Sequence, residues 1–195
     1  MRTLQRPQRA IFDPAEDFPL LMADAPQLRT FAVDTVPAIF QLVEYTTATM
    51  QRDDPTKAAQ LSRVRETWAT RSNSDDPLAV EAVFPEAVCQ VVGGRRVLKA
   101  QLLRLMEVSE LPEVSVRVVP HSAAVYPAMS CPFTWLSFPH RQHNDVAYAQ
   151  MFLRSEYVEP HAEIELVAER FSALRALSLD EGASLELIAE AVTRV

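Results

Sequence analysis

The stretch LAVEAVFPEAVCQVVGGRRVLKAQLLRLMEVSELPEVSVRVV, residues 78–119, decides the fold that we expect from this sequence. Its first part is rich in valine and alanine and predicts a strand with a bend at Pro85. A glycine pair at Gly93 then predicts a turn. Residues 95–109 place leucines on one face of a helix, and residues 114–119 predict a second strand.

The segments that follow this stretch are predicted to form further strands and then helices. Residues 133–138 and 146–152 predict an aromatic-rich hairpin across the polar loop 139–145. The C-terminal part predicts helices, the last of which is expected to begin at a capping box, Ser178-Leu-Asp-Glu181.

The segments that precede it predict an irregular arm and helices. Residues 1–30 carry four prolines and are expected to be irregular, and helices are expected from Pro37 and from Pro55. Central strands with helices at both ends predict an α+β fold with a small, mostly antiparallel sheet. We expect a Pro-rich arm over 1–27 and one domain over 28–195.

The composition excludes several classes of protein. A content of 48% hydrophobic residues can fill a core, whereas a net charge of -7 disfavours direct binding of nucleic acid. The three glycines cannot form a Gly-rich phosphate loop or a dinucleotide fingerprint, so no cofactor is expected. The sequence carries no export signal and no apolar run that would span a membrane, and its two cysteines give no disulfide framework. These features predict a cytoplasmic protein.

Several motifs, in a fixed order, resemble one known family. The opening segment Val36-Pro-Ala-Ile-Phe-Gln-Leu-Val-Glu-Tyr45 is similar to the pattern V-P-G-L-L-Q-T-x-x-Y of a domain of unknown function. That domain usually follows the helix-turn-helix of actinobacterial XRE-type transcriptional regulators. Other segments of the chain also resemble motifs of this family. They are Glu86-Ala-Val-Cys89, Cys131-Pro-Phe-Thr-Trp-Leu-Ser-Phe138 and further blocks at residues 92–94, 100–103, 113–120 and 174–177.

The resemblance covers about residues 28–194 and departs from the family at three points. Ala38 stands in place of the glycine of the opening segment, and Pro85 in place of an acidic residue. Residues 1–27 stand where the helix-turn-helix is expected. The family's role implies that the chain resembles a sensor or partner-binding half without its DNA-binding head, and it implies no catalytic residues.

Three residues are candidates for acid or base chemistry. Glu86 lies in a mostly apolar segment, where burial would favour its protonated form, or it is an edge carboxylate that caps a helix or pairs with Arg95 or Arg96. His121 follows a strand and precedes the loop that contains Tyr126, where sites are commonly built, or it is a half-exposed loop histidine.

Aromatic residues on the expected hairpin are candidates for a ligand pocket. Phe133 and Trp135 alternate along one strand and so share a face of the sheet. They either fill the core or form the wall of a pocket that Trp68 or the arm closes. Met129 and Tyr148 complete the set of candidate ligand-binding residues.

Other reactive side chains have plainer interpretations. His140 and His143 have a spacing that could chelate zinc, but a solvated turn is the simpler interpretation, and no metal is expected. Cys89 and Cys131 are interpreted as small apolar residues, and only His121 is a candidate base for Cys131.

Three functions are left open by the sequence. The first is the binding of a small apolar or aromatic ligand, or of a small partner protein, by a sensor-type domain. The second is a cofactor-independent cyclase or isomerase of specialised metabolism, with Glu86, His121 or Tyr126 as acid or base. The third is a protein-interaction module, with the C-terminal helices as the surface of a homodimer.

Overall fold

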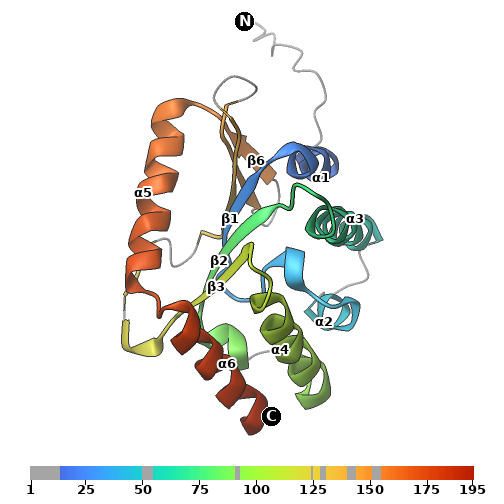
Figure 1. Ribbon diagram of the computed structural model, residues 1–195, viewed down its shortest axis with the longest axis vertical. Helices are drawn as coiled ribbons and strands as arrows, with labels where there is room; N and C mark the ends of the chain where they lie inside the picture. Colours follow the sequence, from blue (N-terminus) through green and yellow to red (C-terminus); the bar gives the residue numbers. More distant parts are fainter. Residues whose placement is uncertain are drawn as a thin grey trace, which may run out of the picture.

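The centre of the fold is a mixed six-stranded sheet with the strand order β3-β2-β1-β4-β5-β6 (Figure 1). The computed structural model describes residues 14–49, 55–90, 93–123, 125–127, 131–139, 144–150 and 155–195. The strands are β1 (Gln27–Phe31), β2 (Ala79–Pro85), β3 (Val114–Val119), β4 (Phe133–Ser137), β5 (Val146–Gln150) and β6 (Ser155–Val158).

The predicted fold class is wrong, because half of this sheet is parallel. β1 pairs with β2 and β2 pairs with β3, both in parallel. The connections between these strands contain the helices α2 (Val43–Thr49), α3 (Pro55–Ser72) and α4 (Arg95–Ser109). Strands that alternate with helices build an α/β fold, since parallel neighbours need a crossover connection.

The other half of the sheet is antiparallel, as the hairpin prediction requires. β4 pairs with β1 on one side and with β5 on the other, and β6 follows as the edge strand. The register places Thr134 opposite Tyr148 and Arg29 opposite Trp135. Successive side chains alternate between faces, so this register fixes which aromatic side chains meet.

Residues 1–30 were expected to be irregular, but their described part forms the helix α1 (Pro14–Asp24) and most of the strand β1. Phe18 and Met22 of α1 are buried in the same apolar cluster as Leu28 of β1. Apolar burial therefore stabilises this segment despite Pro19 within the helix. The domain boundary between residues 27 and 28 stays a prediction.

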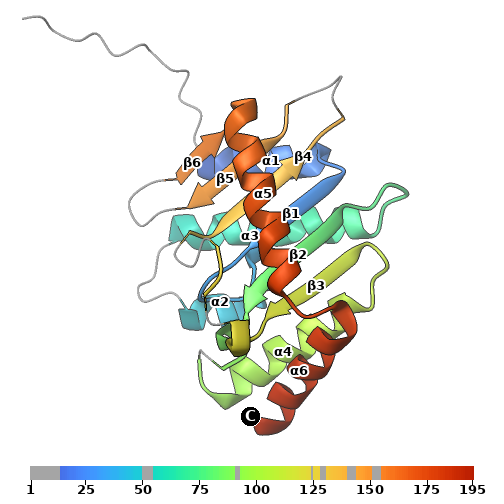
Figure 2. The same ribbon diagram turned by 90° about the vertical axis from the view of Figure 1, so that its left-hand side faces the viewer.

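Helices cover both faces of the sheet (Figures 1 and 2). The main apolar cluster lies between one face and α1, α3, α4 and α6 (Glu181–Arg194). The single helix α5 (His161–Leu177) crosses the opposite face, where Phe171 and Leu174 pack against Phe31, Val83 and Val119.

The opening segment of the resembled family forms a tight, buried connection rather than one long helix. A 3-10 turn, η1 (Ala38–Phe40), precedes α2, and the chain is extended at Gln41 between them. The Gln41 side chain donates a hydrogen bond to the Val36 carbonyl at 2.6 Å, and the Tyr45 hydroxyl accepts one from the Val36 amide at 3.2 Å. Side chains thus satisfy the backbone where the helix is interrupted.

The last helix is present, but its predicted cap is wrong. Asp180 is the N-cap of α6, and its carboxylate accepts a hydrogen bond from the amide of Ala183 at 2.8 Å. Ser178 instead ends α5, where its hydroxyl donates a hydrogen bond to the Leu174 carbonyl at 2.8 Å. Serine and aspartate are both common N-cap residues. Because the connection is short, Ser178 still belongs to the end of α5, and Asp180 is the residue that caps α6.

Candidate functional site

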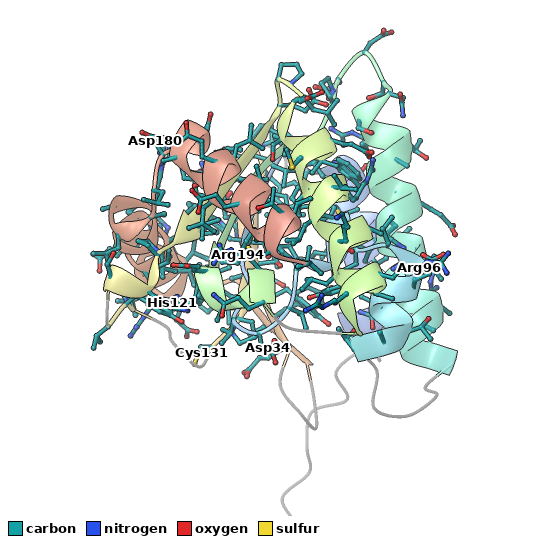
Figure 3. All side chains as sticks on the ribbon, turned by 90° about the horizontal axis from the view of Figure 1, so that it is seen from below. Asp34, Arg96, His121, Cys131, Asp180 and Arg194 are labelled. Atoms are coloured by element: carbon teal, nitrogen blue, oxygen red, sulfur yellow. The ribbon has the colours of Figure 1, made fainter. Side chains whose placement is uncertain are left out.

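The carboxyl ends of the three parallel strands meet at one edge of the sheet. Asp34 lies shortly after β1, Glu86 follows β2 at the start of the 3-10 turn η2 (Glu86–Gln90), and His121 follows β3 in η3 (His121–Ala123). β4 is antiparallel, so Cys131 precedes its start at the same edge. Figure 3 labels Asp34, His121 and Cys131 on this side of the molecule. Ligands of α/β sheets commonly bind outside such carboxyl ends.

Glu86 and His121, both predicted to be site residues, are in direct contact. The Glu86 Oε2 atom accepts a hydrogen bond from the His121 amide at 2.9 Å and lies 3.2 Å from the His121 Nδ1 atom. The Glu86 side chain is 18% exposed and that of His121 is 56% exposed. A carboxylate at Nδ1 favours a ring that carries its proton there, which leaves Nε2 as an acceptor. Glu86 is therefore engaged by His121 rather than by Arg95 or Arg96.

Aromatic side chains gather at the same edge of the sheet, at the end of β1 and the start of β4. The Phe31 ring centroid lies 6.0 Å from that of Tyr126 and 6.1 Å from that of Phe133. Phe133 also makes an edge contact with Phe171 of α5 at 6.4 Å. Ala123, at the end of η3, packs against the same cluster. We call Glu86, His121, Tyr126 and Phe133 the carboxyl-edge site.

Trp135 lies two residues farther from this edge than Phe133, in a row of polar side chains across the sheet. The Arg29 guanidinium carbon lies 4.3 Å from the centroid of the Trp135 ring, and the Trp135 indole donates a hydrogen bond to Asp145 at 2.9 Å. Burial lowers the pKa of Arg29, whereas Glu81 and Asp145 raise it. Sequence reasoning did not identify Arg29 and considered Asp145 only beside His140 and His143, although an arginine inside a short alternating strand signals a buried charge partner.

Trp68 and Tyr148 lie on the opposite face of the sheet. Trp68 of α3 is buried and makes an edge contact with Phe40 at 5.3 Å. Tyr148 stacks against Phe18 of α1 at 4.9 Å and belongs to the main apolar cluster. Trp68 therefore does not cover Trp135, and the predicted aromatic residues do not line a shared pocket. Met129 lies outside the described residues.

A depression of about 200 Å³ lies at the other end of the sheet, where the parallel strands begin. Its charged lining comes from Glu81, Glu113, Arg175 and Glu181. Glu81 Oε1 lies 2.9 Å from Arg175 Nε, and Ser115 donates a hydrogen bond to Glu181 at 2.7 Å. Glu81 and Glu181 thus already have partners on neighbouring elements, so the depression is a polar groove that joins α5 and α6 to the sheet.

The two cysteines differ in environment, which gives a testable difference in reactivity. Burial raises the pKa of the Cys89 thiol to about 12, and nearby Glu86 acts in the same direction. Cys131 is exposed. Because the thiolate is the nucleophile, we expect one thiol per chain to react rapidly with an aromatic disulfide reagent at pH 8. Replacement of Cys131 by serine should remove that fast phase, and two fast thiols in the wild-type protein would contradict the assignment.

The pH dependence of stability follows from the same pKa shift. The unfolded chain releases the Cys89 proton above a pH near its ordinary value of 9.0, whereas the folded chain keeps the proton until about 12. Protons then bind more strongly to the folded state, so the free energy of unfolding should fall as the pH rises through this range. Burial raises the pKa of Tyr45 as well, which adds to the same trend.

Within the described ranges, no group of three or more His, Cys, Asp or Glu side chains could hold a metal ion. His140 and His143, the considered zinc ligands, lie outside the described residues. Among the helices that the structure describes, none has both the length and the apolar composition that a membrane crossing needs.

Comparison with known proteins identifies a family. The sequence model of one family, described as Domain of unknown function (DUF5753), matches residues 15–190. The matched range contains every residue of the carboxyl-edge site. No curated protein and no solved structure matches the chain.

Proposed function

We propose a function from one premise: the chain belongs to the family of this domain of unknown function, DUF5753. In our proposal the chain is a sensor-type domain that binds a small apolar or aromatic ligand at the carboxyl-edge site. A small partner protein that binds in response to the ligand is compatible with this role. The resemblance to the sensor half of transcriptional regulators supports a binding role.

One observation carries the proposal, namely the contact between Glu86 and His121 at the ends of adjacent parallel strands. A largely buried carboxylate orients a histidine whose ring is more than half exposed. Such an arrangement fixes one ring nitrogen and presents the other to solvent. An oriented hydrogen-bonding group beside apolar surface is the usual composition of a small-molecule site.

The neighbouring aromatic side chains supply the apolar part of the site. Phe133 and Tyr126 are only partly buried, so part of each ring remains available to a ligand. Removal of such apolar surface from water stabilises a complex by about 25 cal/mol per Å² before the costs of association. The polar pair would then set the orientation of the ligand.

The chain offers a matched control for the pair. His161 and Glu165 on α5 form an exposed contact of the same type, with the imidazole Nε2 atom 3.5 Å from the carboxylate. This second pair lies in the first turns of α5, outside the carboxyl-edge site. Variants of both pairs therefore distinguish an effect of any histidine–glutamate contact from an effect that is specific to the carboxyl-edge site.

The test is a thermal-shift screen of purified protein against small apolar and aromatic compounds. We expect a specific ligand at about 100 times its Kd to raise the Tm by about 5 °C or more. His121→Ala and Glu86→Gln should lose this shift, whereas His161→Ala and Glu165→Gln should keep it. Ligands that stabilise all four variants equally would contradict the proposal.

The same contact also supports a second candidate, a cofactor-independent cyclase or isomerase. A histidine held by a carboxylate is a common general base, because the carboxylate stabilises the imidazolium that forms. Glu86, His121 and Tyr126 would then be catalytic residues. Product formed by purified protein without added cofactor, with strong loss in Glu86→Gln, would favour the enzyme. Ligand that is bound and recovered unchanged would favour the sensor.

A further inference from the structure

We infer that the ligand of the carboxyl-edge site is a planar compound with an acidic hydroxyl group, such as a phenol or an enol, and that this hydroxyl donates to Nε2 of His121. The inference rests on the proposed function of that site. It names the chemical class that the side-chain arrangement selects.

The Glu86 carboxylate orients the ring of His121. Glu86 Oε2 accepts a hydrogen bond from the backbone amide of His121 and lies within hydrogen-bond distance of its Nδ1 atom. The carboxylate is thus fixed to the backbone of the residue whose ring it contacts, so backbone and ring are oriented together. The neutral ring with its proton on Nδ1 has an acceptor at Nε2, which suits a ligand that donates.

The charge of the Glu86 carboxylate affects the acceptor at Nε2. Partial transfer of a proton to Nε2 makes the ring more cationic, and the Glu86 carboxylate stabilises that charge. The hydrogen bond to Nε2 therefore contributes more binding free energy for an acidic hydroxyl than for a weakly acidic alcohol. Figure 3 labels Asp34 and Arg194 on the same side of the molecule, so the charge there is mixed, and the Glu86 carboxylate beside the ring is what disfavours a ligand that is already an anion.

The aromatic side chains at this edge favour a flat ligand. The half-buried rings of Tyr126 and Phe133 belong to the cluster that also contains Val33 and Ala123. Ala123 and His121 belong to the same 3-10 turn, so the apolar cluster reaches the turn that carries the acceptor. Aromatic rings pack well in offset or edge arrangements, which favours a flat ring attached to the hydroxyl.

The test uses 2-naphthol and 2-methoxynaphthalene, which differ in the hydroxyl proton, as probes of the whole chain. Calorimetric titration should give a Kd about tenfold lower for 2-naphthol, because one hydrogen bond distinguishes the two compounds. The anion 2-naphthoate should bind more weakly than either. Bound 2-naphthol, which becomes a strong acid on excitation, should show more naphtholate emission where a base contacts its hydroxyl.

The variants separate this inference from the proposed function. In His121→Ala the preference for 2-naphthol and the additional naphtholate emission should both disappear, while 2-methoxynaphthalene binds as before. Glu86→Gln should weaken the preference, and His161→Ala should leave it unchanged. Circular dichroism checks that each variant is folded, and His121→Gln provides a second substitution at the exposed position.

Two results would overturn the inference. Equal affinities for the two naphthalenes, with both lost in a Phe133→Ala variant, would leave the binding site in place and reject the hydroxyl class. A preference for 2-naphthol that persists in His121→Ala would place the acceptor elsewhere. Failure of all three probes to bind at millimolar concentration would contradict the proposed function and the inference together.

Discussion

Replacement of Gln101 by leucine should lower the free energy of unfolding by about 3 kcal/mol, since it leaves two backbone groups without partners. Gln101 of α4 is fully buried. Its side chain accepts a hydrogen bond from the Leu42 amide at 2.7 Å and donates one to the Phe40 carbonyl at 3.0 Å. Leucine has a similar size, so the change removes the polar contacts with little change in packing volume.

Urea unfolding measures this loss, and Lys99→Leu is its control. Lys99 is exposed on the same helix, so leucine there should change stability by less than about 0.5 kcal/mol. Thermal unfolding should give the same order of stabilities. A Gln101→Leu variant as stable as the wild-type protein would mean that water or a shifted backbone satisfies both groups.

Gln101 contacts the backbone of the segment that resembles the family's opening motif. The segment from Val36 to Tyr45 was among the recognisable parts of the sequence, and the structure gives it a structural role. Gln101, from another recognisable block, bonds to the backbone at the join between η1 and α2. Two family-like motifs that are far apart in sequence are thus parts of one buried connection.

The sequence identified most elements of the sheet but not its direction, and a single strand explains the error. β1 has five residues, follows a Pro-rich segment, and carries Arg29 at its centre. Without β1, the remaining strands suggest a small antiparallel sheet. With β1, strands alternate with helices from residue 27 to residue 119, which is the pattern of a parallel sheet.

The candidate site was predicted residue by residue, but its assembly was not. Glu86 and His121 are 35 positions apart in sequence, and their contact depends on the parallel register that pairs Pro85 with Val119. The aromatic residues show the same dependence. Tyr148 lies opposite Thr134, so it shares a face with Thr134 rather than with Trp135.

Replacement of Glu81 by leucine is expected to lower the free energy of unfolding by about 2 kcal/mol and to loosen α5. The Glu81 side chain is 12% exposed, and one carboxylate oxygen lies 2.9 Å from Arg175 Nε of α5. Its other oxygen lies 3.8 Å from Arg29 Nε. Loss of this carboxylate leaves the half-buried Arg29 without its nearest acidic partner, and the exposure of Arg175 keeps the loss below that of a fully buried pair.

Hydrogen exchange across α5, alongside urea unfolding, separates these two effects. Only Ile164, Phe171 and Leu174 are buried among the described side chains of this helix, so the ion pair is a large part of its attachment. Glu156→Leu, at an exposed strand position, is the control and should alter neither measurement. Because Phe171 contacts Phe133 of the carboxyl-edge site, a loosened α5 should also weaken 2-naphthol binding in Glu81→Leu. Unchanged exchange in α5 would show that apolar packing alone holds the helix against the sheet.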